Sequence, residues 1–212
     1  GGGFVLGVAD DPGMHSSQNE QDSRHYAIAA KLPMIEPADS AECRDFIKTA
    51  FELSEQFDTP TILRLTTRIA HSRAPVEPGE RVEVALKPYE KNAAKRVMVP
   101  ANSRVRHVAV EQRIKALSEF VETTPLNRIE KGGKIGVIAA GICYQYAKEA
   151  LGDKASYLKL GVVNPLPVKL IQEFAAGVDE LYVLEELDDV IQTHCAKIGV
   201  ACKGKELFSL CG

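Results

Sequence analysis

The chain has 212 residues, of which 45% are hydrophobic, with 26 basic and 29 acidic side chains. This is ordinary globular composition, long enough for one or two domains with real cores. The formal net charge of −3 argues against nucleic acid as the main partner, because phosphate binding needs a basic surface. No apolar run approaches the roughly 20 residues needed to cross a bilayer, so no membrane partner is expected.

The first 72 residues alternate between strand and helix patterns. The expected elements are a strand over 4–9, a helix over 24–31, a short strand over 34–36, an amphipathic helix ending near residue 57, and a strand over 61–67. Asp39 and Glu42 have the spacing of a capping box at the start of the second helix. This order predicts parallel strands joined by crossover helices.

Residues 73–130 differ in character, because prolines interrupt them and charges are dense. We expect a connector with short strands near 82–86 and 96–99 and one amphipathic helix over 105–121. Its basic side chains could hold an anion such as coenzyme A, but a clamp on neighbouring carboxylates such as Glu111, Glu119 and Glu122 is favoured. These basic residues are Arg96, Arg104, Arg106, His107, Arg113 and Arg128.

Residues 131–212 show a second strand–helix alternation. Strands are expected over 134–140, 157–163 and 181–185, helices over 141–151, 168–175 and 188–198, and a short strand near 200–202. This alternation predicts an open doubly wound sheet. Both ends of the chain are apolar, and we expect an internal fragment in which the first strand has neighbours upstream.

The five cysteines are widely scattered and show no C-x-x-C spacing, so neither a disulfide framework nor an iron–sulfur site is indicated. A cytoplasmic location is the simplest expectation. The residues are Cys43, Cys143, Cys195, Cys202 and Cys211.

The segment 10–24 is dense in polar groups and follows a buried strand. It therefore emerges at a strand's carboxyl end, where open α/β sheets bind ligands. The alternative is a solvated surface loop. Asp10 and Asp11 are rejected as a metal pair, because adjacent residues on an extended segment face opposite sides.

Two other segments favour structural roles. Gly136 and Gly141 resemble half of a dinucleotide fingerprint, but close packing of helix against sheet explains them better. The acidic residues of 185–189 could hold a metal, yet carboxylates at a helix start complement its dipole without any ligand.

Several long motifs, taken together, resemble one enzyme family along essentially the full chain. The motifs are VADDPGMHSSQNEQDSR over 8–24, EPADS over 36–40, RLTTRIAHS over 64–72, MVPANSR over 98–104, PLNRIE over 125–130, GICYQY over 141–146, LKLGVVNPLP over 158–167 and VLEELD over 183–188. The family is that of the indolepyruvate:ferredoxin oxidoreductase α subunit, within the thiamine-diphosphate-dependent 2-oxoacid:ferredoxin oxidoreductases.

The resemblance implies an α/β fold in which a partial PYR-type parallel sheet is followed by a transketolase C-terminal-like doubly wound domain. Residues 1–72 would be the second half of the PYR-like domain, 73–130 the connector and 131–212 the second domain. The full enzyme would oxidatively decarboxylate aryl 2-oxo acids such as indolepyruvate to aryl-acetyl-coenzyme A and reduce ferredoxin. Two alternatives to this function remain. The full protein is another 2-oxoacid:ferredoxin oxidoreductase, or the chain is a non-catalytic assembly domain.

The resemblance also limits what this chain holds. Thiamine diphosphate, Mg²⁺ and [4Fe–4S] clusters would bind the full-length enzyme, which would be oligomeric with a β subunit and ferredoxin as partners. The chain alone is expected to bind none of these groups, to contain no catalytic residue or metal ligand, and to be inactive. One loop is expected near the cofactor or substrate: Gly13, Met14, His15, Ser16, Ser17, Gln18 and Asn19.

Overall fold

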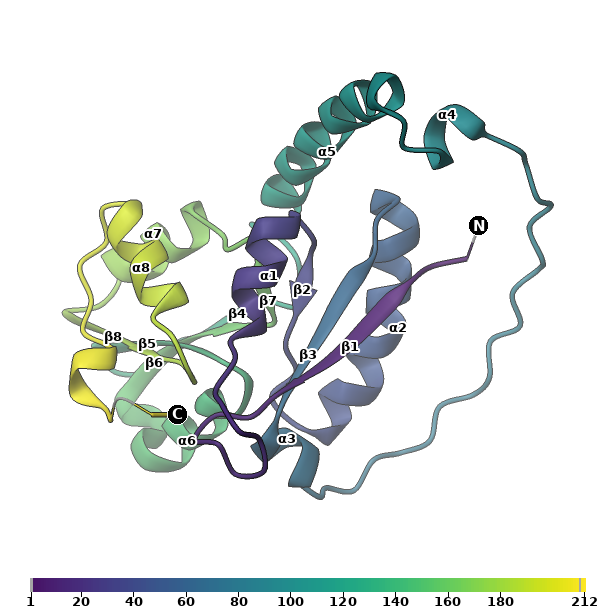
Figure 1. Cartoon of the computed structure of the whole chain (residues 1–212). Helices are drawn as coiled ribbons and strands as arrows, with labels where there is room; N and C mark the ends of the chain where they lie inside the picture. Colours follow the sequence, from purple (N-terminus) through teal and green to yellow (C-terminus); the bar gives the residue numbers. More distant parts are fainter. Residues whose placement is uncertain (1, 210) are drawn as a thin grey trace.

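The computed structural model describes residues 2–209 and 211–212. Within them the chain forms an α/β fold with two four-stranded sheets, and helices pack against both (Figure 1). The α/β class expected from the sequence is therefore confirmed.

The first sheet has the strand order β1-β3-β2-β7, in which the first three strands are parallel. Asp22 caps the helix that follows β1, and its carboxylate accepts the Arg24 N–H. Asp39 caps α2 and accepts the Glu42 N–H at 2.8 Å, as the capping-box spacing predicts, whereas Glu42 accepts the N–H of Ala38, the residue before the cap, and not that of Asp39. The elements are β1 (Val5–Asp10), α1 (Ser23–Ala30), β2 (Met34–Ile35), α2 (Ser40–Phe57), β3 (Thr61–Thr66) and α3 (Thr67–His71).

The second sheet has the order β4-β6-β5-β8. Strand β4 is antiparallel to β6, whereas β5 is parallel to both of its neighbours. The expected strand near 200–202 is reduced to a single bridge between Lys203 and Tyr182. The elements are β4 (Arg128–Glu130), β5 (Ile135–Ala140), α6 (Gly141–Leu151), β6 (Ala155–Leu160), α7 (Lys169–Ala176), β8 (Glu180–Leu184) and α8 (Val190–Lys197).

The strand expected over 157–163 is divided between the two sheets. It leaves the second sheet at Leu160 and continues as β7 (Val162–Asn164), which pairs antiparallel with β2 of the first. Gly161 stands at the crossing, and a Cβ there would lie only 2.4 Å from the Leu126 carbonyl oxygen. Asn127 accepts the N–H groups of Gly161 and Val162, both at 3.0 Å, and so satisfies the backbone where the strand changes sheet.

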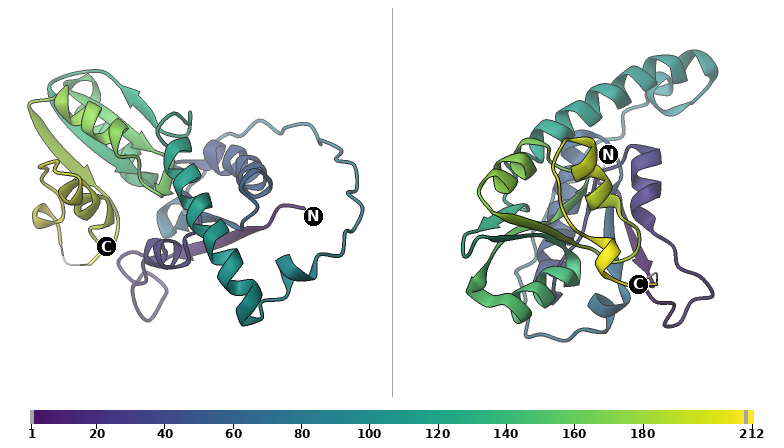
Figure 2. Two further views of the ribbon diagram at one scale, coloured as in Figure 1. Left: turned by 90° about the horizontal axis from the view of Figure 1, so that it is seen from above. Right: turned by 90° about the vertical axis from the view of Figure 1, so that its left-hand side faces the viewer.

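The connector departs most from expectation. The strand expected over 82–86 is not formed, since these residues have no regular secondary structure, and the one expected over 96–99 is replaced by the turn of α4 (Ala93–Arg96) and an irregular segment. Helix α5 (Pro100–Phe120) begins five residues earlier than expected, with Pro100 in its first turn. It projects away from the sheets, and residues 72–92 sweep outside them (Figures 1 and 2).

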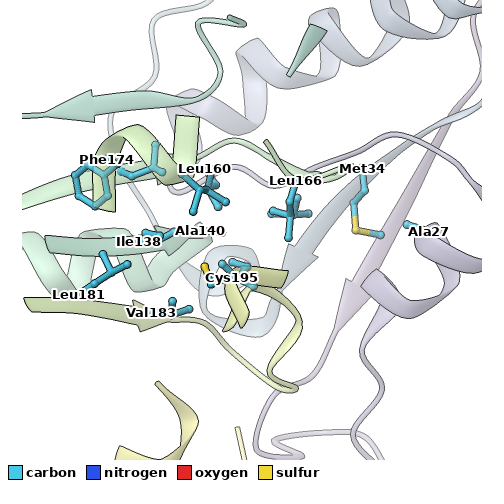
Figure 3. Close-up of a cluster of buried hydrophobic side chains, with 14 of the residues drawn as sticks. Ala27, Met34, Ile138, Ala140, Leu160, Leu166, Phe174, Leu181, Val183 and Cys195 are labelled. Carbon is cyan, nitrogen blue, oxygen red and sulfur yellow. The ribbon is translucent and has the colours of Figure 1, made fainter. Parts of the chain in front are cut away.

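One hydrophobic core joins the two sheets (Figure 3). Ala27 and Met34 from the first part of the chain pack in the same cluster as Ile138, Leu160 and Cys195 from the second. The two sheets are therefore parts of one packed body.

We expect the Glu130 carboxylate, at the end of β4, to stabilise the folded chain in a way that is lost in acid. It accepts hydrogen bonds from Tyr144, Lys148 and Arg128 at 2.6, 2.9 and 3.0 Å. Burial would raise the pKa of Glu130, but these three donors lower it from 4.5 to about 2. The unfolded chain thus takes up this proton at a higher pH than the folded chain, so the stabilisation is complete above pH 4.5 and is lost as the pH falls toward 2.

We expect Glu130→Gln to flatten the decline of stability over that pH range, as measured by urea unfolding midpoints. Glu149→Gln, on the neighbouring helix, is the matched control and should follow the parent. An equally steep decline in Glu130→Gln would show that Glu130 makes no such contribution.

Candidate functional site

A buried cluster of charges lies at the carboxyl ends of β1 and β3. Arg64 projects from β3 and donates to Asp10 at 2.6 Å and to Glu36 at 2.7 Å. The side chains of all three are at most 4% exposed. Burial would lower the pKa of Arg64, but Glu36, Asp22 and Asp10 together raise it, so the guanidinium stays charged.

Arg24, at the start of α1, connects this cluster to the second sheet. It makes a two-atom ion pair with Asp22 and a further one with Glu185, which directly follows β8. Its guanidinium also donates to the carbonyl oxygens of Glu186 and Asp188, each at 2.8 Å. Three groups of the loop that follows β8, the Glu185 carboxylate and the two carbonyl oxygens, thus hold α1 through Arg24.

The acidic segment after β8 has the helix-start role expected from its sequence. Glu185 accepts the N–H groups of Ile191 and Gln192 in the first turn of α8. Burial raises the pKa of Glu185, against the opposing effect of Arg24 and these two donors. The pairing of Glu185 with Arg24, 161 residues away, was not expected.

Asp11 determines the shape of the loop that follows β1. Its carboxylate accepts the N–H groups of Ser16 and Ser17, both at 2.7 Å, and the Thr67 hydroxyl at 2.5 Å. The Thr67 hydroxyl, with these two amides, holds the pKa of Asp11 well below its usual range. Asp10 instead binds Arg64 and the Ser23 N–H, so the two adjacent carboxylates face different partners, as expected.

The residues expected near a cofactor or substrate lie at the tip of this loop. Gly13 to Asn19 are all exposed, and Gly13 and Met14 have positive φ angles of 77° and 55°. Only glycine adopts the first of these without strain. The tip therefore projects from the carboxyl edge of the first sheet, on a base fixed by Asp10 and Asp11.

Three buried polar atoms of the cluster have no hydrogen-bond partner in the described structure. They are Arg64 Nη2, Thr66 Oγ1 and Glu186 Oε2. Burial raises the pKa of Glu186, whose carboxyl lies beside Thr66. A largely apolar pocket of about 520 Å³ adjoins Glu186 at the carboxyl ends of β5 and β8, with Cys143, Leu184 and Lys205 in its wall.

The two glycines of the second sheet serve close packing, as favoured from the sequence. A Cβ at Gly136 would lie 2.7 Å from Val178. Gly141 has a φ of +53°, and a Cβ there would lie 2.3 Å from the Glu36 carboxylate. Gly141 thus lets the start of α6 approach the charged cluster.

Three connector arginines act as clamps, but on partners other than those expected. Of the expected carboxylates, Glu111 meets a basic residue of the connector, His107, at 3.2 Å within the same helix. Arg106 lies 3.6 Å from Asp58, and Arg113 donates to the Phe57 carbonyl. Arg128 pairs with Glu42 at 3.1 Å. Glu122, one of the expected partners, instead accepts three N–H groups at the start of α7.

The described residues offer little support for a metal-binding site. Their only close group of three metal-capable side chains is Asp22, His25 and Asp188. Asp22 is already paired with Arg24, and His25 lies 2.8 Å from Asp188 as an exposed pair. The described residues bring no four cysteine thiols together, so they do not fit a [4Fe–4S] cluster.

The sequence reasoning missed Arg24, Arg64, Glu36 and Glu185 as members of one site. One feature of the sequence could have identified the site, namely a charged residue inside an otherwise apolar strand. Arg64 interrupts the run Thr61–Thr66, and fully buried arginines occur almost only when paired.

Two solved structures share the fold of this chain. The fold is similar to a 2-oxoglutarate:ferredoxin oxidoreductase from Magnetococcus marinus, solved with 2-oxoglutarate, coenzyme A and succinyl-CoA bound. The TM-score is 0.65 at 14% identity, covering 99% of this chain and 46% of that one. It is also similar to a split-gene transketolase, an inactive tetramer, with a TM-score of 0.54 at 17% identity over 94% of this chain and 55% of that one. At these identities the likeness concerns the fold alone.

The sequence relatives are more specific. The chain is 39% identical over 206 residues to the indolepyruvate oxidoreductase subunit IorA of Archaeoglobus fulgidus, covering 94% of this chain and 33% of that protein. It is 42% identical to the subunit of the same name from Methanothermobacter thermautotrophicus, covering 90% of this chain and 32% of that protein. No family model matches the chain.

These matches confirm the resemblance found in the sequence: the chain is homologous to indolepyruvate oxidoreductase subunits, and its homologues are oxidoreductases. It spans about a third of the length of the curated relatives that it matches. No helix in the described part of the chain is long and apolar enough to span a membrane.

Proposed function

We propose that the chain forms the middle part of a cytoplasmic, thiamine-diphosphate-dependent oxidoreductase that converts indolepyruvate and related aryl 2-oxo acids to aryl-acetyl-coenzyme A. The observation that carries this proposal is the similarity to indolepyruvate oxidoreductase subunits over nearly the whole chain. In this proposal residues 1–72 are the second half of the PYR-like domain, 73–130 the connector and 131–212 the transketolase-like domain. A β subunit and ferredoxin are the proposed partners of the full enzyme.

The described residues fit one wall of a thiamine diphosphate site. Asp10, Asp11 and Glu36 are already committed to Arg64 or to backbone N–H groups. The groups left without a partner among the described residues are Arg64 Nη2, the Thr66 hydroxyl and Glu186 Oε2, and the exposed loop tip lies beside them at the same edge of the sheet. When bound, thiamine diphosphate supplies the electron-accepting ring that lets a 2-oxo acid lose carbon dioxide.

The role of the charged cluster in this proposal is to position the loop tip. Asp10 accepts the Ser23 N–H where the loop ends, and Asp11 accepts the Ser16 and Ser17 N–H groups within the tip. Arg64 and Arg24 hold Asp10 and Asp22 in turn. His15, Ser16, Ser17 and Gln18 would then donate or accept hydrogen bonds at the cofactor or substrate. Mg²⁺ and [4Fe–4S] clusters are proposed to bind elsewhere in the longer protein.

The loop proposal predicts a kinetic effect of His15→Ala and Gln18→Ala in the full-length enzyme. Loss of one hydrogen bond at the site should lower kcat/KM for indolepyruvate about tenfold, equivalent to about 1.4 kcal/mol. Steady-state assays with a ferredoxin-type acceptor measure this. Lys91→Ala, at an exposed position of the connector, is the control and should leave kcat/KM unchanged.

A second candidate function is assembly without chemistry. The commitment of the buried carboxylates near the loop to arginine and backbone partners favours it. Under this candidate, both loop variants would have parent kinetics. Titration calorimetry of the 212-residue chain with thiamine diphosphate is expected to show no binding under either candidate, and turnover by the chain alone would overturn both.

A further inference from the structure

The connector contains an exposed segment with the pattern of a strand but no strand to pair with. Residues 72–92 have no regular secondary structure, and every one is exposed. Within them the sequence RVEVALKPY, residues 81–89, alternates charged or small residues with apolar ones. The apolar side chains Val82, Val84 and Leu86 are 75%, 76% and 98% exposed. Such alternation is typical of a strand with one buried face.

One face of α2 holds this segment alongside the body of the protein. Arg44 donates to the Glu77 carbonyl, Lys48 lies against Gly79, and Lys87 pairs with Glu55. Positions 44, 48, 51 and 55 lie on one helix face because of their spacing. The contacts that keep the segment in place are therefore polar. Its apolar side chains remain uncovered.

We propose that residues 81–89 pair with the same residues of a second copy of this chain, as antiparallel strands related by a two-fold axis at Ala85. In this register Glu83 of each copy lies opposite Lys87 of the other, which makes two ion pairs. Val84 lies opposite Leu86 on the other face, so the apolar side chains of both copies form one continuous surface. The proposal is independent of the proposed catalytic function.

Two other antiparallel registers of this segment oppose like charges, and an axis at Leu86 forms no ion pair within it, because Glu83 then lies opposite Tyr89. An axis at Val84 places Arg81 opposite Lys87, and an axis at Glu83 places that carboxylate opposite itself. A shift of the pairing by one residue places the apolar side chains of one copy beside the charged side chains of the other. Parallel pairing in register again places Glu83 opposite Glu83. The pattern is thus self-complementary in the register centred on Ala85, as an interface with two-fold symmetry requires.

A cover for the apolar face is available on the same side of α2. Phe51 lies between Lys48 and Glu55 on the helix face that holds the segment, and it is 46% exposed. A two-stranded ribbon alone is marginal in water and needs such packing. Two exposed ion pairs, Lys87–Glu55 and Arg81–Glu83, would be exchanged for the pairs between Lys87 of one copy and Glu83 of the other.

Cysteine crosslinking in the 212-residue chain tests the register, in a Cys211→Ser background that removes the exposed native thiol. Ala85→Cys places two thiols directly opposite each other, at a separation that a disulfide can span. Mild oxidation should therefore give a covalent dimer on a non-reducing gel. Glu83→Cys is the matched control and should give none, because its own counterpart lies several residues away along the ribbon.

Light scattering after size exclusion tests the pairing itself. The parent chain should be a dimer, Val84→Lys should raise the dissociation constant at least tenfold, and Ala85→Ser should not. A monomeric parent would overturn the proposal and indicate that another part of a longer chain, or a different subunit, covers the segment. A dimer that Val84→Lys leaves intact and that Ala85→Cys does not crosslink would also overturn it.

Discussion

Arg64→Ala is expected to lower the free energy of unfolding by about 3–5 kcal/mol, because it leaves buried carboxylates without their counter-ion. Asp10 and Glu36 both accept from this guanidinium, and both side chains are at most 4% exposed. Urea unfolding monitored by circular dichroism measures the loss.

Arg68→Ala is the control for this experiment, because Arg68 is exposed four residues further along the chain. Its effect should be within about 0.5 kcal/mol. A loss below about 1 kcal/mol for Arg64→Ala would show that the cluster admits water. Arg64→Lys should recover only part of the loss, because a single ammonium group cannot reproduce the two directed bonds of the guanidinium.

Glu42→Ala is expected to lower the free energy of unfolding by about 3 kcal/mol, because it leaves a buried cation without its carboxylate partner. Lys159 on β6 is fully buried, pairs with Glu42 at 2.5 Å and lies 4.8 Å from the centre of the Phe46 ring. Burial lowers the pKa of Lys159, and Glu42 partly offsets this effect. Without Glu42 the ammonium must lose its proton or remain buried without its carboxylate partner.

Glu42→Ala should also change how the free energy of unfolding depends on pH, which a simple loss of packing would not do. Its folded chain holds the Lys159 proton less tightly than its unfolded chain, so the unfolded state binds more protons below pH 10.5. Stability should therefore rise with pH from neutrality toward 10 in Glu42→Ala, relative to the parent. Asp45→Ala, which removes an exposed carboxylate of the same helix, should show neither the loss nor the slope. A parallel pH profile in Glu42→Ala and the parent would exclude the proposed cause.

The elements of this fold were largely predictable because their signals are local. The capping residues Asp39 and Glu42, the periodicity of α2 and the apolar runs of β3 and β5 each depend on neighbours a few residues away. The connector was less predictable. The alternation over 82–86 predicted a strand, and the structure has none there, because a strand needs a partner to pair with and local alternation does not supply one.

The location of the loop was also predictable, because a polar segment after a buried strand emerges at the carboxyl edge of the sheet. The contacts that anchor the loop were not predictable from the sequence. Arg64 meets Glu36 across 28 residues and Arg24 meets Glu185 across 161, and no local pattern encodes such pairs. The class of fold, the family resemblance and the candidate loop thus follow from the order of the residues. The continuation of β6 into β7 across the two sheets and the buried ion pairs that hold the loop are visible only in the folded chain, because burial and pairing arise when distant segments pack together.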